Sequence, residues 1–261
     1  MLRLGFVGTG TLAAAVIDGL QHTHGERTDI LVSPRSEAVS RGLAERHANV
    51  TRASSNEEVV ENADVVFLGV LPSQLEVVAG LPFRADQVVV TFLAGVAHAR
   101  VVEAVAPASR VARVIPLPPI RLRQGPIAIY PADPVVEELF GGLGTLVVAQ
   151  READLGNMGI ASAMMSTHYA MQNRMIGWLG SRGMSPAMAE AYVRAMFAGL
   201  AAIGLDALAH GESVDPAHHE TPGGLNWRGR GYLTEQGWFD AVDGALDAIE
   251  AHAHDLSKKK G

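Results

Sequence analysis

The sequence contains no cysteine, and its lysines are confined to one run at the C-terminal end. Of the 261 residues, 0 are Cys, and the lysines are Lys258, Lys259 and Lys260. Without cysteine the protein forms no disulfide, uses no thiolate nucleophile and holds no cysteine-ligated metal. Without a lysine in the body of the chain, lysine-dependent chemistry is disfavoured. We interpret the lysine run as a solvated tail.

Long apolar runs and an excess of positive charge are also missing, and we expect no signal peptide. No uninterrupted apolar stretch reaches the ~18 residues that a membrane-spanning helix needs, and the N-terminus leads directly into an apolar strand. The formal net charge of −7 gives no electrostatic basis for nucleic-acid binding. With 48% hydrophobic and 19% charged residues, the chain is typical of a globular protein. We therefore expect a cytoplasmic location, with no membrane and no nucleic acid as partner.

The N-terminal stretch is a strand, a tight glycine turn and a helix in succession. An apolar strand ends at Gly8, and the helix that follows begins with Thr11, Leu12 and Ala13. Gly8 permits the sharp turn, and Gly10 leaves room for a pyrophosphate to approach the backbone. The first amides of the helix and its dipole would face the phosphates. The pattern predicts a dinucleotide site made by Gly8, Gly10, Thr11 and Leu12.

The end of the second predicted strand, Asp29–Ser33, indicates which dinucleotide binds. An NAD site usually places Asp or Glu there to hold the ribose 2′-hydroxyl group, whereas a 2′-phosphate needs hydrogen-bond donors and positive charge. Ser33 and Arg35 are donors, and no carboxylate stands at the strand end. This predicts NADP, bound as NADPH, with NAD as the alternative. In the other interpretation Ser33 caps a helix and Arg35 is a surface residue.

Up to residue 151 the sequence alternates strand and helix patterns. Further strands are predicted at 63–70, 87–93, 110–115, 126–130 and 145–149, with helices starting near Pro34 and at 56–62 and 134–143. Such alternation is typical of a doubly wound parallel sheet, a Rossmann-like α/β fold. We assign residues 1–151 to this dinucleotide-binding domain.

Residues 152–261 show helix patterns only, and we assign them to a second, all-α domain. The predicted helices are 153–179, 185–208 and 234–256, with Ser185 and Thr234 as N-caps. The helix from Ser185 is rich in Ala and Met around most of its circumference. Because such a helix must be covered on most sides, we expect a homodimer that packs through the helical domains. Packing against the first domain alone is the other interpretation.

Several motifs in order along the chain resemble those of the pyrroline-5-carboxylate reductase family. They extend over nearly the whole sequence, and the Pro-Gly-Gly stretch is the most specific to the family. The motifs are Gly8-Thr9-Gly10, Ser33-Pro34-Arg35, Val70-Leu71-Pro72, Phe92-Leu93-Ala94-Gly95, Arg113-Val114-Ile115-Pro116 and Thr221-Pro222-Gly223-Gly224.

This resemblance implies a nicotinamide-dependent reductase that delivers hydride to the C=N carbon of a cyclic imino acid, giving proline. It implies a helical dimerisation domain after the dinucleotide domain. It places Val70, Leu71, Pro72, Ala94 and Gly95 at the cofactor. In the substrate site it places Pro222, Gly223 and Gly224, with Thr221 and Asn226 as the candidate catalytic residues.

The departures from the family pattern concentrate on the substrate side. Leu117 stands in the place of a family asparagine, Met164 and Met165 in a segment that is usually rich in Gly and Ser, and Leu225 in the place of a family threonine. If these residues line the pocket, a bulkier imine is an alternative substrate. A non-catalytic NADP-binding regulatory protein is a second alternative. A β-hydroxyacid dehydrogenase is disfavoured, because its helical domain would need a catalytic lysine.

Two histidine-containing groups attract attention as ligands or acids. They are His218-His219-Glu220, just before the Pro-Gly-Gly stretch, and His168-Tyr169 in the first long helix. Adjacent histidines point in different directions on a regular backbone, and one His-Tyr pair on a helix is commonly packing. We therefore predict no metal site.

Overall fold

In the computed structural model, which describes residues 1–258, the chain forms two compact units divided between Met158 and Gly159. The domain boundary expected from the sequence, between residues 151 and 152, falls at the start of helix α7 (Glu152–Ser162), whereas the structural division falls inside this helix. The two units are described separately below.

The first unit is built on a single sheet of eight strands within residues 1–158. The strand order is β3-β2-β1-β4-β5-β6-β7-β8, and β1 to β6 are mutually parallel. The strands are β1 (Leu2–Val7), β2 (Thr28–Val32), β3 (Val50–Arg52), β4 (Val65–Leu68), β5 (Val88–Thr91), β6 (Arg110–Pro116), β7 (Pro126–Tyr130) and β8 (Thr145–Val148). The Rossmann-like class is confirmed, and the carboxyl ends of β1 to β6 meet at one edge.

The alternating pattern predicted a parallel sheet, and this is wrong for the last two strands. Strand β7 runs antiparallel to β6, and β8 is parallel to β7. Only residues 117–125, with one short 3₁₀ helix at Pro118–Leu122, connect β6 to β7. A right-handed parallel crossover usually requires a dozen residues or more, so this short connection returns the chain antiparallel.

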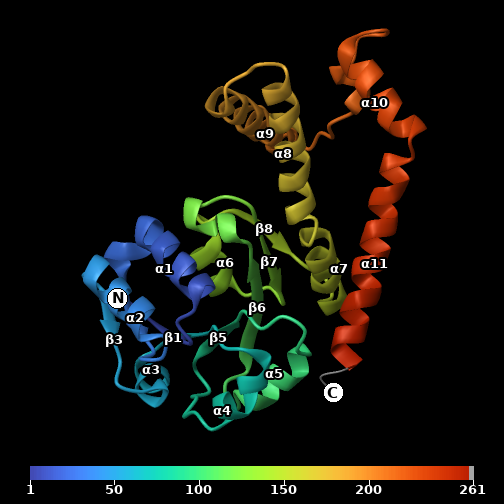
Figure 1. Cartoon of the computed structure of the whole chain (residues 1–261). Coiled ribbons are helices and arrows are strands. Elements are labelled where there is room, and N and C mark those ends of the chain that lie inside the picture. Colours follow the sequence, from blue (N-terminus) through green and yellow to red (C-terminus); the bar gives the residue numbers. More distant parts are fainter. Residues whose placement is uncertain (259–261) are drawn as a thin grey trace. The chain divides into compact units, whose positions relative to one another are not determined.

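Helices cover both faces of the sheet (Figure 1), and each face carries its own core. Helices α1 (Thr11–His24), α2 (Glu37–Arg46) and α6 (Pro134–Phe140) pack on one face, where the rings of Phe6 and Phe67 stack with centroids 4.3 Å apart. Helices α3 (Asn56–Asn62), α4 (Leu75–Ala79) and α5 (His98–Ala104) pack on the other. Strands buried on both faces account for the continuous apolar runs in the sequence.

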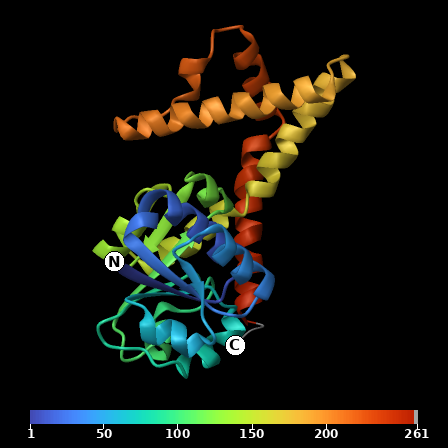
Figure 2. The ribbon, with the colours of Figure 1, turned by 90° about the vertical axis from the view of Figure 1, so that its left-hand side faces the viewer.

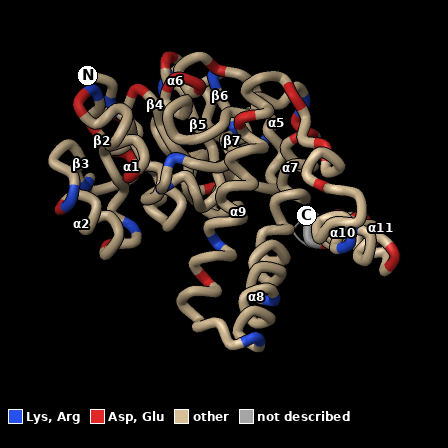
Figure 3. Tube along the Cα trace, turned by 90° about the horizontal axis from the view of Figure 1, so that it is seen from above, with Lys and Arg blue, Asp and Glu red and all other residues tan. Residues whose placement is uncertain are grey.

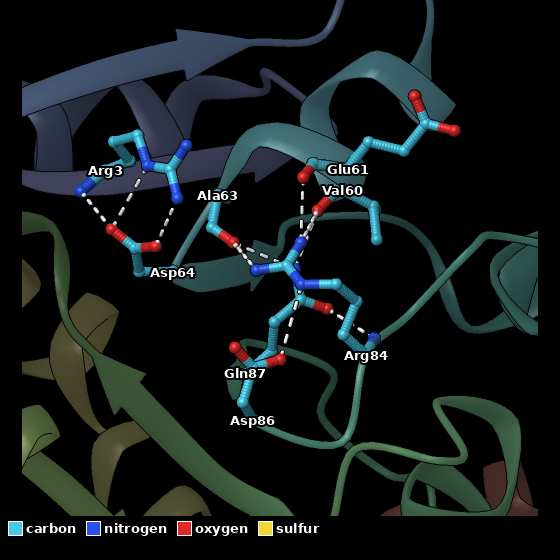
Figure 4. Close-up of polar contacts among 8 residues, drawn as sticks. All are labelled: Arg3, Val60, Glu61, Ala63, Asp64, Arg84, Asp86 and Gln87. Atoms are coloured by element: carbon cyan, nitrogen blue, oxygen red, sulfur yellow. Dashed lines mark hydrogen bonds and ion pairs between the residues drawn. The ribbon is translucent and has the colours of Figure 1, made fainter.

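Helix α3 ends without a glycine cap, and two side chains from a later loop satisfy its last carbonyl groups (Figure 4). The amide of Gln87, which is fully buried, donates to the carbonyl groups of Val60 and Ala63 at 2.6 and 2.9 Å. Arg84 donates to the same two carbonyl groups and to that of Glu61 at 2.8 Å. The buried end of α3 is thus capped from outside the helix.

Gln87→Leu is expected to lower the free energy of unfolding by about 2–3 kcal/mol, because it removes the buried donor to the Val60 and Ala63 carbonyl groups and leaves the partly buried Arg84 backbone amide without its acceptor. The Gln87 side-chain oxygen accepts a hydrogen bond from the Arg84 N–H at 2.8 Å, and leucine cannot replace it. Urea denaturation measures the change. Gln124→Leu, the same substitution at an exposed position, should stay within about 0.5 kcal/mol of the parent; equal losses in the two variants would contradict the capping role.

An ion pair beside this loop joins β1 to the start of β4. Arg3 Nη2 lies 2.7 Å from Asp64 Oδ1, and the Arg3 backbone N–H also donates to this carboxylate (Figure 4). The hydrogen bond from the Arg3 guanidinium lowers the pKa of Asp64 below its ordinary value.

The second unit contains α8 (Met165–Ser181), α9 (Pro186–Ala209), α10 (Leu225–Glu235) and α11 (Trp238–Lys258). Helices α8 and α9 pack as a hairpin (Figure 2). Ser185 caps α9 as predicted, since its hydroxyl group accepts the Met188 N–H at 3.4 Å. The residues of the lysine run after Lys258 lie outside the described residues.

Two helix predictions for this half are wrong. The helix expected over 153–179 breaks at Ala163 and Met164, where α7 gives way to α8. Neither residue is a helix breaker, and Leu155 of α7 packs on the sheet of the first unit, so tertiary packing sets the break. Thr234 caps nothing: it lies in the last turn of α10 and its hydroxyl group donates to the Arg230 carbonyl. Gly237, with φ +67°, separates α10 from α11.

Apolar side chains are exposed along α8, α9 and α10. On α9 only Ala189 and Val193 are buried, and charged residues are sparse along α8 and α9 (Figure 3). The exposed large side chains include Trp178, Met188, Tyr192, Leu200, Ile203, Leu205, Leu208 and Trp227. By length and composition alone, α9 satisfies the criteria for a membrane-spanning helix, although the sequence has no uninterrupted apolar run of that length.

Candidate functional site

The glycine turn after β1 has a conformation that requires glycine at its first position. Gly8 has φ +91°, and a Cβ atom there would lie 2.6 Å from the Gly69 carbonyl oxygen. No L-side chain fits such an approach, so Gly8 allows β1 and β4 to end close together. By contrast, a Cβ atom on Gly10 would meet nothing within 4 Å.

Ser33 lies beneath this turn and not on the wall of the site. Its side chain is fully buried, and its hydroxyl oxygen accepts the Gly8 N–H at 3.0 Å. Thr9, also buried, donates to the Ser33 carbonyl group at 3.1 Å, and the two hydroxyl groups lie 3.0 Å apart. The hydroxyl group predicted to bind a 2′-phosphate is thus already engaged, and its structural role is to brace the glycine turn.

A pocket of about 250 Å³ opens above the turn, at the carboxyl ends of β1, β2 and β4. Its lining includes five of the predicted cofactor residues and three that sequence reasoning missed. The predicted ones are Gly8, Gly10, Arg35, Val70 and Leu71, and the missed ones are Ser36, Asn56 and Gln74. Asn56 begins α3 shortly after the end of β3, and its position in a short polar segment between a strand and a helix could have identified it as a ligand-facing residue. The pocket is at the point where the strand order reverses, the usual place for a ligand in such sheets.

The N-terminus of α1 faces the turn with its amides uncapped. Gly10 is the N-cap residue and makes no side-chain cap, and the first turn contains no acidic residue. Thr11 is exposed and Leu12 half-buried, as residues at this helix end. Uncapped amides and the positive end of the helix dipole suit an anion such as a pyrophosphate.

The turn after β2 carries positive charge and donors into the same pocket. Arg35 is exposed, and Ser36 adopts a left-handed conformation with φ 61°. Arg52 of β3 donates to the Pro34 carbonyl group at 3.1 Å and so holds the turn. None of the described residues that line the pocket is Asp or Glu. The lining therefore offers no carboxylate that could accept a hydrogen bond from a ribose 2′-hydroxyl group.

Three other predicted cofactor residues lie at this edge outside the pocket lining. Pro72 begins a 3₁₀ helix, Pro72–Gln74, just after β4, and its neighbour Leu71 is 67% exposed at the pocket rim. Ala94 and Gly95 are exposed after β5, where Gly95 has φ +73°. The strand order places them on the β4–β5–β6 half of the edge.

The predicted substrate residues divide between the two units. Leu117, half-buried, follows β6 in the first unit. Met164 is the N-cap residue of α8 and Met165 its first residue, 41% exposed. The remaining ones, Thr221, Pro222, Gly223, Gly224 and Asn226, form the turn before α10 and its first residues.

The Pro-Gly-Gly turn presents the start of α10, a helix that sequence reasoning missed because its segment holds two glycines and few apolar residues. Gly224 donates its N–H to the Thr221 carbonyl group at 2.7 Å, so this amide is used within the turn. Gly224 is the N-cap residue of α10 and makes no side-chain cap. The amide of Asn226 donates to the His219 carbonyl group at 2.8 Å. The amides suited to an anion are therefore those of the first turn of α10, and not that of Gly224.

An ion pair connects the residue before this turn to α10. Glu220 pairs with Arg230 of α10, with Arg230 Nη2 2.8 Å from Glu220 Oε2. The hydrogen bond from Arg230 lowers the pKa of Glu220. Among the described residues, no group of three or more His, Asp or Glu side chains is arranged to hold a metal ion.

His168 is engaged in packing between α8 and α9. Its ring contacts that of Phe197 edge-on at 5.5 Å, and the Gln172 amide lies 2.5 Å from its Nε2 atom. Arg194 of α9 donates to Gln172, which is buried. The cluster ties the two helices together.

Comparisons with known proteins agree with the motif reading. Residues 3–95 match the family model described as NADP oxidoreductase, coenzyme F420-dependent. Over 99% of its length the chain is 26% identical to pyrroline-5-carboxylate reductase 3 of Xenopus laevis, of which it covers 97%.

Solved structures share the fold over nearly the whole chain. A pyrroline-5-carboxylate reductase from Coxiella burnetii matches with a TM-score of 0.83 at 21% identity, covering 97% of each chain. A pyrroline carboxylate reductase from Plasmodium falciparum, solved with NADP bound, matches with a TM-score of 0.76 at 17% identity, covering 98% of each chain. The family resemblance predicted from the motifs is confirmed.

Proposed function

We propose that this chain, a divergent relative of the pyrroline-5-carboxylate reductase family, is an NADPH-dependent oxidoreductase that reduces a cyclic imine. The observation that carries the proposal is the pocket above the Gly8 turn, which combines an uncapped helix N-terminus, Arg35 and no carboxylate. Pyrroline-5-carboxylate, reduced to proline, is the leading substrate.

The residues present fit NADPH. Gly10 leaves open space where a pyrophosphate would reach the α1 amides. Arg35 and Ser36, in the turn that follows β2, supply the charge and the donors that a 2′-phosphate needs. Asn56 and Gln74 add polar groups to a lining that also contains apolar residues such as Val70 and Leu71, a combination that suits an adenosine group.

When bound, NADPH would supply the hydride that the C=N carbon accepts. A protonated imine already carries the proton that its nitrogen needs, and a neutral imine takes one from solvent or from a donor group of the protein. The protein has to bind the imine and orient its C=N carbon toward the nicotinamide ring. We assign the first-turn amides of α10 to the substrate carboxylate, because they lack a cap. Thr221 and Asn226 are the candidates that contact the nitrogen.

The identity of the imine has to be measured, because Leu117, Met164 and Met165 are apolar residues at positions where the family pattern has asparagine, glycine or serine. NADPH oxidation should be measured with pyrroline-5-carboxylate, its six-membered homologue and larger cyclic imines. Turnover of at least one imine is expected. The imine with the highest kcat/KM identifies the substrate class. Measurable NADPH binding without turnover of any imine would sink the proposal in favour of a regulatory NADP-binding protein.

We further propose a cytoplasmic homodimer in which a second copy covers the exposed faces of α8, α9 and α10. A single membrane-spanning helix would account for α9 alone, whereas apolar side chains are exposed on all three helices. An interface between two copies accounts for all of them.

Sedimentation at micromolar concentration is expected to give twice the 27.5 kDa mass of the chain. Leu200→Glu on α9 should shift the equilibrium toward monomer, since it places a charge in the interface. Leu122→Glu is the matched control, because Leu122 is similarly exposed, at 58% against 52%, but lies in the first unit. A parent protein that sediments as a monomer would remove the claim.

A further inference from the structure

Among the described residues, Arg113 in the middle of β6 is the most deeply buried charged side chain for which the proposed mechanism gives no role. It is 5% exposed and lies in register with Thr91, the last residue of β5. Arginine is rarely buried to this extent, because its charge is costly to remove from water. Its Nε atom has no hydrogen-bond partner in the described part of the chain. Stability alone does not account for arginine at this position, since an apolar side chain would fill the space without that cost.

The guanidinium group of Arg113 connects the loop after β5 to the start of α7. Its Nη2 atom donates to the Val96 carbonyl group, and its Nη1 atom lies 3.1 Å from Glu152 Oε1. The same Glu152 oxygen accepts the His98 N–H at 2.7 Å. The His98 ring in turn donates to the Val111 carbonyl group of β6 at 3.0 Å. Arg113 and Glu152 thus link the loop after β5, the first residue of α5 and the start of α7.

These contacts substitute for restraints that the loop itself lacks. Ala97, the N-cap residue of α5, makes no side-chain cap, so the Glu152 carboxylate from α7 takes that place for His98. Ala94 and Gly95 carry no side chain that could anchor them, and Gly95 has φ +73°. A loop of this composition is flexible unless it is held from outside.

The sheet order indicates which part of a dinucleotide this loop would face. The strand order reverses between β1 and β4. Arg35, which we assign to the 2′-phosphate, follows β2 and so lies on the β1–β2 side. The adenosine half of a bound dinucleotide would therefore lie over β1 and β2, and the nicotinamide half over β4, β5 and β6. The loop at 94–97 follows β5, on the nicotinamide side.

We propose that Arg113 is a positioning residue that, together with Glu152, holds the 94–97 loop against the nicotinamide end of bound NADPH. This rests on the proposed function for the identity of the cofactor. Arg113 acts through the Val96 carbonyl group and Glu152, and it contacts neither cofactor nor substrate. Its removal should loosen the nicotinamide ring and leave the adenosine contacts in place.

The test follows the fluorescence of the reduced nicotinamide as NADPH is titrated into the protein, which requires no imine. Arg113→Gln and Glu152→Ala should lower the emission enhancement and anisotropy of bound NADPH by about half. The dissociation constant should rise less than about threefold, because binding energy from the adenosine half is retained. Glu152→Gln keeps an oxygen that accepts the His98 N–H, so it should fall between parent and Glu152→Ala.

Arg110→Gln is the matched control on the same strand. Arg110 pairs with Asp133 at 2.8 Å and has no contact with the loop, so this variant should lose thermal stability without any change in the nicotinamide signal. Unchanged emission in both Arg113→Gln and Glu152→Ala overturns the proposal. Arg113→Lys, which keeps the charge and one donor, should restore part of the signal.

Turnover gives an independent reading of the same step. With an imine that the parent enzyme reduces, Arg113→Gln should lower kcat by about tenfold with little change in KM for NADPH. The kinetic isotope effect for NADPH deuterated at the transferred position should increase. A chain that binds NADPH but reduces no imine overturns the proposed function, while the fluorescence result still decides the role of Arg113. A chain that binds no NADPH overturns both.

Discussion

Gly10→Val is expected to abolish NADPH binding while leaving the fold intact. Gly10 lines the pocket, and open space extends for 4 Å around the position that its Cβ atom would occupy. Its backbone, with φ −85° and ψ −176°, is one that valine adopts readily. The added side chain therefore strains nothing in the protein and fills the space in front of the α1 amides. We expect the dissociation constant for NADPH to rise at least about 100-fold, equivalent to about 2.7 kcal/mol.

Gly8→Ala is the informative counterpart, because the neighbouring glycine of the same turn has a different role. With φ +91° and a Cβ position 2.6 Å from the Gly69 carbonyl oxygen, Gly8 cannot be replaced without moving β1 or β4. Thermal denaturation should show a marked loss of stability for Gly8→Ala, and a change of less than about 2 °C for Gly10→Val. If Gly10→Val binds NADPH as the parent does, the pocket above the turn is not the dinucleotide site.

Arg35→Ala should convert a protein that prefers NADPH into one that does not discriminate. Arg35 is the one cation among the described residues that line the pocket. A charge-assisted hydrogen bond to a phosphate contributes about 1.5–3 kcal/mol, so the dissociation constant for NADPH should rise about 10- to 100-fold. NADH lacks the 2′-phosphate, and its dissociation constant should change less than about threefold.

Titration calorimetry with both nucleotides measures this preference. Arg41→Ala, which breaks an exposed pair with Glu37 on the same helix, controls for the loss of one positive charge near the site. Equal losses of affinity for the two nucleotides in Arg35→Ala would contradict the 2′-phosphate role. Ser33→Ala should behave differently from both, since it removes the brace under Gly8 and so weakens NADPH and NADH alike.

The cofactor half of the molecule was largely predictable because local sequence signals coincide with it. Helix α3 and strand β7 have the predicted bounds, Asn56–Asn62 and Pro126–Tyr130. A glycine turn between a strand and a helix fixes both the elements and the position of the ligand. Burial was the part that the pattern did not reveal: Ser33 and Arg35 look equivalent as donors in the sequence, and only the fold directs one under the turn and the other into the pocket.

The helical half was less predictable because its breaks are set by packing. Ala163 and Met164 favour helix, yet the chain changes from α7 to α8 there. Helix α10 was missed because Gly229 and Gly231 weaken its pattern. The deep burial of Arg113 follows from its place in the central part of the sheet, and the contact with Glu152 joins residues far apart in the sequence. Spacing along the chain carries no signal for such a contact.

The residues that the family resemblance assigns to the substrate come from both units, and the departures from the family pattern lie among these residues. Leu117 follows β6, while Met164, Met165 and Asn226 belong to the helical unit. The apolar character of Leu117, Met164 and Met165 is the reason for testing imines larger than pyrroline-5-carboxylate. The Asn226 amide that the resemblance assigns to the substrate nitrogen already donates to the His219 carbonyl group.

The transfer of deuterium from NADPH to the product amine tests the central claim most directly. The protein is incubated with a cyclic imine and NADPH deuterated at the transferred position of the nicotinamide, and the product is examined by mass spectrometry and NMR. We predict that one deuterium appears on the former C=N carbon, and that Gly10→Val gives no labelled product. NADPH that binds to the parent protein without label reaching any imine would contradict the account.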